Sequence, residues 1–174
     1  MFYIMDARGP CKGHNPGGAM RLTQFTDYAL RTLLYLSVQG DRAVPLTEIA
    51  RSYGVSYNHL VKVAGSLVEL GLVASVRGRS GGFRLACAPD QINIGWLVRR
   101  TEPDFHLVEC FDEETDQCPI TPACRLKLVL VEAQASFLTV LDGYTLADFP
   151  ASPTNRGRLV QLWADRHAAT VAAG

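Results

Sequence analysis

The residues with the clearest chemical potential are three cysteines in the second half of the 174-residue chain. Seven residues separate Cys110 from Cys118, and five separate Cys118 from Cys124. Three thiolates on a loop this short can converge on one metal centre. Zinc sites favour paired Cys-x-x-Cys motifs and four ligands, whereas an iron–sulfur cluster accepts looser spacing. The spacing therefore favours an iron–sulfur cluster, with zinc, a redox disulfide or no metal as open alternatives.

A cluster held by three cysteines lacks one thiolate, so another group must supply the fourth ligand. The residues alone leave several candidates open, namely a small molecule or Asp27, His106, Asp112, Glu113, Glu114 or Asp116. The other two cysteines, Cys11 and Cys87, stand alone in the sequence. We expect no role for the first and a minor packing role for the second.

The formal net charge of zero hides an uneven distribution. Residues 20–100 carry ten basic and five acidic residues, whereas residues 101–124 carry seven acidic residues and no Lys or Arg. Charge asymmetry of this kind is typical of chains that contain a nucleic-acid-binding module. We therefore expect the basic segment to bind DNA and the acidic cysteine loop to lie away from it.

The hydropathy pattern predicts a cytoplasmic protein. No stretch approaches the roughly 18 uninterrupted apolar residues of a membrane-spanning helix. The N-terminal sequence MFYIMDARGP also fails the signal-peptide pattern, because charged residues interrupt its apolar run. In a reducing compartment, cysteines serve as metal ligands or redox groups more often than as structural disulfides.

The basic segment has the pattern of a helix-turn-helix. Apolar periodicity predicts helices at about 26–39, 46–53 and 57–70, and Ser56 can cap the third of them. The third helix has an apolar stripe on one side and polar residues on the other, which are Asn58, His59, Lys62, Ser66 and Glu69. One face can therefore pack while the other contacts DNA.

A wing follows the third helix. Short strands are predicted at 72–76 and 83–86, and the segment RGRSGG at 77–82 joins them. Three glycines and two arginines exceed what a tight hairpin turn requires. Glycine lets the backbone approach a phosphate closely, and an arginine can enter the minor groove.

A short helix at 94–99 precedes the acidic loop, and a long helix is predicted at 125–141. One side of the long helix has coiled-coil spacing, with Leu126, Leu130, Ala133, Phe137 and Val140. Its second apolar side consists of Leu128, Val131, Ala135 and Leu138. A helix that is apolar on two sides must be covered twice, by its own domain and by an identical partner. We expect a homodimer.

Together these elements predict a mainly α-helical protein, a winged helix-turn-helix with a small β-hairpin wing and a long dimerisation helix. We divide the chain into a disordered leader (1–19), a DNA-binding domain (20–100), a cysteine loop (101–124), the dimerisation helix with its following turn (125–149) and a tail (150–174). The tail has a modest helical pattern at about 158–171. No nucleotide-binding glycine motif or nucleophile with a paired base is present, so we do not expect an enzyme.

Over about residues 20–150 the chain resembles the winged-helix iron–sulfur regulators of the IscR, NsrR and BadM family, and within it the nitric-oxide-sensing NsrR branch. The segments that carry this resemblance are MRLTQFTDYALR (20–31), VPLTEIA (44–50), LVELGLVASVRG (67–78), RGRSGGFRLA (77–86), INIGWLVR (92–99) and the three-cysteine loop. The resemblance implies a homodimeric repressor of a palindromic operator. It also implies an iron–sulfur cluster, of the four-iron type in preference to the two-iron type.

The resemblance further implies which residues hold the cluster. NsrR-like members use an aspartate of the first helix as fourth ligand to the cluster of the partner subunit, and the matching residue here is Asp27. IscR-like members use a histidine three residues after the last cysteine, where this chain has Lys127. The metal ligands are thus expected to be Cys110, Cys118 and Cys124 together with Asp27 of the partner subunit. The first cysteine gap is longer than is usual in the family.

By the same resemblance, the third helix enters the major groove of DNA and the wing enters the minor groove. The expected contacts are Arg31, Ser56, Tyr57, Asn58, His59, Lys62, Arg77, Arg79, Ser80 and Gly81. Nitric oxide is expected to displace Asp27 first, because a carboxylate is the weaker ligand, and so to release the operator. The alternatives are a sensor of iron–sulfur status or redox state, a winged-helix protein with zinc or no metal, and a cluster-bearing redox protein.

Overall fold

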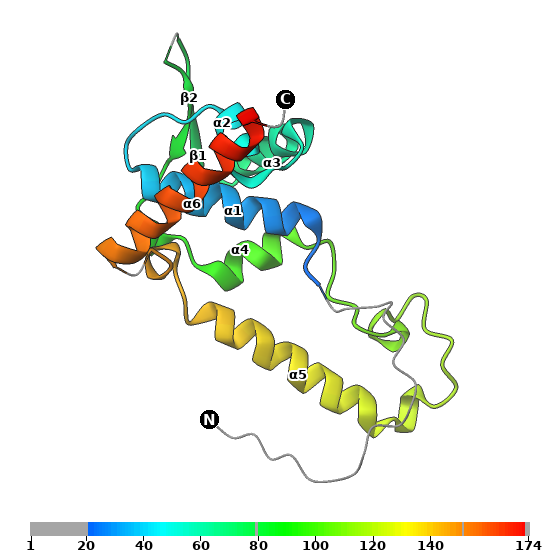
Figure 1. Cartoon of the computed structure of the whole chain (residues 1–174). Coiled ribbons are helices and arrows are strands. Elements are labelled where there is room, and N and C mark those ends of the chain that lie inside the picture. Colours follow the sequence, from blue (N-terminus) through cyan, green and yellow to red (C-terminus); the bar gives the residue numbers. More distant parts are fainter. Residues whose placement is uncertain (1–20, 79, 151, 173–174) are drawn as a thin grey trace.

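The computed structural model describes residues 21–78, 80–150 and 152–172. Within these ranges it contains six α-helices and one antiparallel hairpin, so the predicted mainly α-helical winged fold is confirmed (Figure 1). The helices are α1 (Gln24–Gln39), α2 (Leu46–Tyr53), α3 (Tyr57–Glu69), α4 (Ile94–Thr101), α5 (Arg125–Asp142) and α6 (Pro153–Ala172). The strands are β1 (Val73–Val76) and β2 (Gly82–Leu85). The leader predicted at 1–19 and the wing residue Arg79 lie outside the described residues.

The helix-turn-helix consists of α1, α2 and α3, and its boundaries follow local signals. Helix α2 has the predicted bounds, and Gly54 ends it in the left-handed conformation with φ 64°. Helix α1 starts earlier than predicted, because the Thr23 hydroxyl accepts a hydrogen bond from the Thr26 N–H and caps the helix at Gln24. Ser56 occupies the N-cap position of α3, but its side chain makes no capping hydrogen bond, so that part of the prediction is wrong.

The hydrophobic core lies where α1 packs against α3, the wing and α4. Ala29, Leu33 and Leu36 of α1 are completely buried, because their spacing of three and four residues places them on one face of the helix. The predicted apolar stripe of α3 is also buried, namely Leu60, Val63, Ala64 and Leu67. This packing fixes the opposite face of α3 toward solvent.

The wing is the β1–β2 hairpin, in which Val73 pairs with Leu85 and Val76 with Gly82. A further antiparallel bridge joins Phe83 to Val44, just before α2. We expected the wing glycines to admit a phosphate, but at two of them the chain itself comes close. A Cβ atom on Gly82 would lie 2.5 Å from the backbone oxygen of Val44, and one on Gly81 would lie 2.5 Å from that of Val76. Gly82 therefore serves the packing of the wing on the segment before α2, and Gly81 serves the closure of the hairpin itself.

Helix α5 lies along the outside of the domain, and none of its residues is buried (Figure 1). Its C-terminal end is attached to α4, where Arg99 Nη2 donates to Asp142 Oδ2 at 2.8 Å. The Gln134 amide holds the middle of the helix by donating to the carbonyl oxygen of Phe105. The large apolar side chains left exposed on the helix are Leu126, Leu128, Val129, Val131 and Val140.

Helix α6 begins earlier than the pattern at about 158–171 indicated, and it packs back on α2. Trp163 is 7% exposed and lies between two tyrosines, with its ring centroid 4.5 Å from that of Tyr35 and 5.7 Å from that of Tyr53. One turn later, His167 Nε2 lies 3.4 Å from the Ser52 hydroxyl. The C-terminal tail is therefore part of the helix-turn-helix packing.

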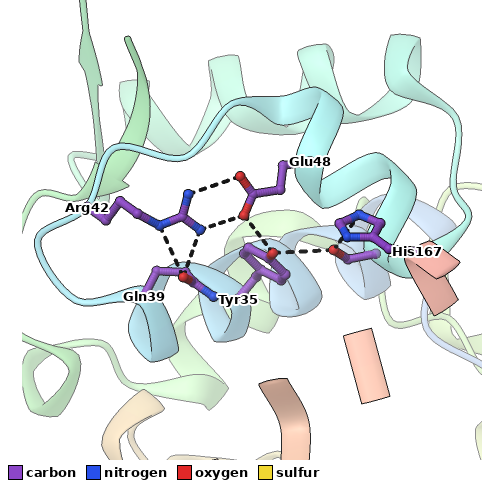
Figure 2. A network of polar contacts seen from close by, with 6 residues as sticks. Tyr35, Gln39, Arg42, Glu48 and His167 are labelled. Atoms are coloured by element: carbon purple, nitrogen blue, oxygen red, sulfur yellow. Dashed lines mark hydrogen bonds and ion pairs between the residues drawn. The ribbon is translucent and has the colours of Figure 1, made fainter. Parts of the chain in front are cut away.

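Figure 2 shows the polar network beside this contact. The Ser52 hydroxyl donates to the Tyr35 oxygen at 3.3 Å, and the Tyr35 hydroxyl donates to Glu48 Oε1 at 2.8 Å. The Arg42 guanidinium binds both carboxylate oxygens of Glu48 and holds its pKa below the usual range. The network thus connects α6, through α2 and α1, to the segment that precedes α2.

Replacing Trp163 by alanine is expected to lower the free energy of unfolding by about 3 kcal/mol, because a buried tryptophan loses its contacts and leaves a cavity. Leu162 is the matched control, since it is the neighbouring residue and is 55% exposed. Leu162→Ala should change the free energy of unfolding by no more than about 0.5 kcal/mol. Urea denaturation measures both values. Equal losses in the two variants would contradict the docking of α6 through Trp163.

In the described parts of the chain, no helix is long and apolar enough to span a membrane.

Candidate metal centre and DNA-binding surface

The cysteine loop connects α4 to α5 and contains two short 3-10 helices, at Glu109–Phe111 and Thr121–Ala123. Cys110 lies in the first of these, and Cys124 is the residue that directly precedes α5. All three cysteines of the loop are half-buried, and none of them forms a disulfide. They therefore retain the thiol groups that metal binding requires.

Acidic side chains shape this loop by accepting hydrogen bonds from it. Asp116 Oδ1 accepts from the Cys118 N–H at 3.0 Å, and Glu109 Oε1 accepts from the Gln117 N–H at 2.9 Å. The Thr115 hydroxyl donates to Asp112 Oδ2 at 2.8 Å. This hydrogen bond lowers the pKa of the Asp112 carboxyl group. Part of the acidic character of the loop therefore has a structural purpose.

The donors of the loop fit an iron–sulfur cluster in their chemistry. Three free thiols in one short segment match the thiolate ligands that such clusters use. Within the described residues, no three His, Cys, Asp or Glu side chains are arranged to hold a metal ion. The loop has no fourth cysteine, so a fourth ligand must be a residue of another type or a small molecule. Lys127, three residues after Cys124, is half-buried on α5 and carries an ammonium group.

Asp27 lies in the first turn of α1 and forms an ion pair with Arg31, one turn later on the same helix. Arg31 Nε donates to Asp27 Oδ1 at 2.8 Å, and Arg31 Nη2 lies 2.7 Å from Asp27 Oδ2. Both side chains remain about two-fifths exposed, at 39% and 42%. They border an open hollow of about 820 Å³ together with Arg21, Leu22, Thr23, Gln24 and Leu30. The carboxylate is thus accessible, and Arg31 occupies both of its oxygens.

This turn of α1 contacts both other helices of the helix-turn-helix. The Arg31 guanidinium carbon lies 5.7 Å from the ring centroid of Tyr53 on α2. Tyr28, next to Asp27, has its ring centroid 6.2 Å from that of His59 on α3. We did not predict these contacts, although the four-residue spacing of Asp27 and Arg31 is the signal of a helical ion pair.

The predicted DNA contacts on α3 all lie on its solvent face. Those exposed there are Ser56, Tyr57, Asn58, His59 and Lys62. In the wing, Arg77 and Ser80 are exposed, whereas Gly81 is half-buried and its N–H donates to the Gly78 oxygen at 3.0 Å. Figure 1 shows the wing and α3 at one end of the molecule and the loop between α4 and α5 at the other.

Comparison with known protein families gives a match over residues 22–152 to Rrf2, described as an iron-dependent transcriptional regulator. The chain belongs to the Rrf2 family. As a member of that family it is a DNA-binding transcriptional regulator and not an enzyme. The matched span includes the helix-turn-helix, the wing, the cysteine loop and α5, and it ends just before α6.

Individual Rrf2 relatives agree with this assignment. The chain is 48% identical over 144 residues to the HTH-type transcriptional regulator NsrR of Halalkalibacterium halodurans. The aligned residues cover 82% of this chain and 99% of that protein. Among solved structures, it is similar to CymR, the global cysteine regulator of B. subtilis, with a TM-score of 0.61, 25% identity and coverage of 76% and 98% of the two chains. It is also similar to T. potens IscR, with a TM-score of 0.60, 28% identity and coverage of 74% and 85%.

Proposed function

We propose that this Rrf2 protein is a homodimeric repressor that releases its operator in response to nitric oxide. Its iron–sulfur cluster, of the four-iron type in preference to the two-iron type, is held by Cys110, Cys118 and Cys124, and Asp27 of the partner subunit supplies the fourth ligand. The observation that carries the proposal is the donor set: three free thiols on a loop without a fourth cysteine, and an accessible carboxylate on the helix that contacts α2 and α3. Identity of 48% to a protein named NsrR supports nitric oxide as the signal.

Charge complementarity supports docking of the loop of one subunit on α1 of the other. Arg21 lines the open hollow beside α1 together with the Asp27–Arg31 ion pair, so the charged residues of the hollow are positive by one charge in sum. The segment 101–124 carries seven acidic residues and no Lys or Arg. Opposite charges on two surfaces steer their encounter and fix their register. The loop of one subunit is therefore expected to dock on this face of the other.

In this arrangement the carboxylate of Asp27 has two competing partners. An iron–sulfur cluster would supply iron atoms that accept the carboxylate and that react with nitric oxide. For Asp27 to serve as a ligand, its carboxylate must turn a lone pair toward the iron, which weakens the contacts that Arg31 makes with it at 2.8 and 2.7 Å. When Asp27 is released, Arg31 pairs with both oxygens again. Two arrangements of one side-chain pair can thus bias the position of α1.

A movement of α1 would be transmitted to α2 and α3 through the side chains that connect these helices. Arg31 lies over Tyr53 of α2, and Tyr28 contacts His59 of α3, which is itself a predicted DNA contact. A shift of this turn would change the position of α3 relative to α3 of the partner subunit. Operators with two half-sites are bound tightly only when the spacing of the two recognition helices matches that of the half-sites. The release of Asp27 would therefore weaken operator binding.

Helix α5 supplies the surface for the dimer. Leucines and valines along it are exposed in the single subunit, with Leu128 the most exposed at 69%. Leu138 and Leu141 instead pack partly on the core of their own domain. A row of large exposed apolar side chains along one helix is typical of an interface.

Leu128→Glu is expected to convert the dimer to a monomer, because each subunit would bury an unpaired carboxylate in the interface. Sedimentation velocity gives the mass, and operator affinity should fall by about 100-fold or more as the two half-sites lose their linkage. Leu162→Glu, on α6, makes the same change at a site that is 55% exposed and should leave the mass unchanged. A dimeric Leu128→Glu protein would contradict α5 as the interface.

The proposed function is tested with protein purified without oxygen. Its visible absorption and its iron content are measured, and operator binding is then followed during separate titrations with nitric oxide, an oxidant and an iron chelator. We expect nitric oxide alone to weaken binding, by about 10- to 100-fold. Release by oxidant or chelator alone would instead support a sensor of redox state or of iron–sulfur status. A colourless protein containing zinc or no metal would contradict the proposal.

A further inference from the structure

Helix α6 lies beyond the span that matches the Rrf2 family, yet it belongs to the packing of the helix-turn-helix. The family match ends at residue 152, and α6 spans Pro153–Ala172. Its anchor is Trp163, buried between Tyr35 of α1 and Tyr53 of α2. In Figure 1 the C-terminal end of α6 (red) lies beside α2 and α3, at the end of the molecule from which the wing projects.

The side chain that α6 brings to this place is Arg166. Its guanidinium lies directly against Gly54, because a Cβ atom on that glycine would come within 2.0 Å of Arg166 Nη2. Gly54 is the turn between α2 and α3 and lies two residues before Ser56, where the solvent face of α3 begins. Arg166 is itself exposed, as is Arg51 in the last turn of α2. Two exposed arginines therefore lie on the elements next to the N-terminal end of the recognition helix.

We propose that Arg166 binds a backbone phosphate of the operator, which makes α6 part of the DNA-binding surface. The inference rests on the proposed binding of an operator and adds a contact outside the matched family span. Guanidinium groups suit phosphate well, because their N–H donors match its oxygens and their charge persists at any physiological pH. Residues 153–172 carry three arginines and one histidine against one acidic residue, so the helix as a whole favours an anionic partner.

The packing of α6 holds Arg166 in position before DNA arrives. Arg166 and His167 come three and four residues after Trp163, so both lie on the same face of the helix as Trp163. Trp163 is buried, and the ring of His167 lies 3.4 Å from the Ser52 hydroxyl on α2. A side chain that lies one turn after one fixed residue and next to another loses little conformational freedom on binding. The contact would therefore add affinity without reading sequence.

The test compares Arg166→Ala with Arg158→Ala, which removes the same charge from an exposed position eight residues earlier on α6. The probe is a duplex that the wild-type protein selects from a random-sequence pool, with a scrambled duplex beside it. Affinities are measured by fluorescence anisotropy between about 50 and 200 mM salt. We expect Arg166→Ala to weaken binding to both duplexes by a similar factor of about ten. The slope of log affinity against log salt should become shallower by about 0.9 for each bound subunit.

Two further results distinguish a phosphate contact from a purely structural role of the Arg166 guanidinium against Gly54. Arg166→Lys should restore most of the salt slope, since lysine also neutralises a phosphate, whereas a purely structural role would not be rescued in this way. Release by nitric oxide should persist in Arg166→Ala. An unchanged salt slope in Arg166→Ala, with normal binding by the wild type, would overturn the α6 contact alone. Failure of the wild type to bind any duplex would overturn the regulator and this contact together.

Discussion

Replacing Cys118 by serine is expected to abolish both the iron content of the protein and its response to nitric oxide. Serine is close to cysteine in size, but its hydroxyl is a poor replacement for a thiolate ligand. The loop should keep its shape, because Asp116 holds the Cys118 N–H at 3.0 Å and the Thr121 hydroxyl at 3.1 Å, and neither contact uses the sulfur. Iron analysis and absorption after anaerobic purification measure the loss, and operator binding should become independent of nitric oxide.

Cys87→Ser provides the matched control. Cys87 is also a free, half-buried cysteine, but it follows β2 and packs on the core of the DNA-binding domain. Burial raises the pKa of its thiol, which opposes the loss of the proton that metal binding requires. This variant should retain iron and the response to nitric oxide. If Cys118→Ser retained both, the assignment of the loop as cluster site would be wrong. If both variants lost iron equally, the loss would report general instability.

Replacing Asp27 by alanine is expected to remove most of the coupling between nitric oxide and operator binding. The variant loses the proposed fourth ligand, so its absorption spectrum should differ from that of the wild type. Its fold should persist, because an exposed ion pair such as Asp27–Arg31 contributes no more than about 1 kcal/mol to stability. The ratio of operator affinities without and with nitric oxide should fall from about 10- to 100-fold toward one.

Arg31→Ala distinguishes the ligand from the ion pair. It breaks the same 2.7 Å contact but leaves the carboxylate of Asp27 free to bind metal. We expect this variant to keep its iron and its spectrum, with weaker operator binding because Arg31 is also a predicted DNA contact. If Asp27→Ala and Arg31→Ala behaved alike, the ion pair and not metal ligation would account for both effects. An Asp27→Ala protein with a wild-type spectrum and full release by nitric oxide would contradict ligation between subunits.

The helix-turn-helix could be predicted from the sequence because its signals are local. Apolar spacing defines one face of α1 and of α3, and Gly54 ends α2 by adopting a conformation that favours glycine. Where a boundary depended on a side-chain contact, the prediction was less accurate. Thr23 rather than Thr26 determines where α1 begins, and the hydroxyl of Ser56 does not cap α3.

The parts that could not be predicted depend on contacts between distant segments. Nothing near Trp163 in the sequence indicates that Tyr35 and Tyr53 surround it, although a lone tryptophan in a polar helix is a signal for docking. The wing glycines are a similar case, because the closeness of Val44 to Gly82 follows from the bridge to a segment before α2. The candidate metal centre divides in the same way, since the cysteine spacing is visible in the sequence, whereas the proposed ligation by Asp27 of the partner subunit is not.

We propose above all that the ligands of one metal centre control the affinity of the protein for its operator. The most direct test adds nitric oxide in known steps to the anaerobic wild-type protein bound to its operator, and records visible absorption and the bound fraction in the same samples. We predict that both signals change together, along one curve, and that operator affinity falls by about 10- to 100-fold. Complete loss of the absorption with the operator still fully bound would contradict the claim.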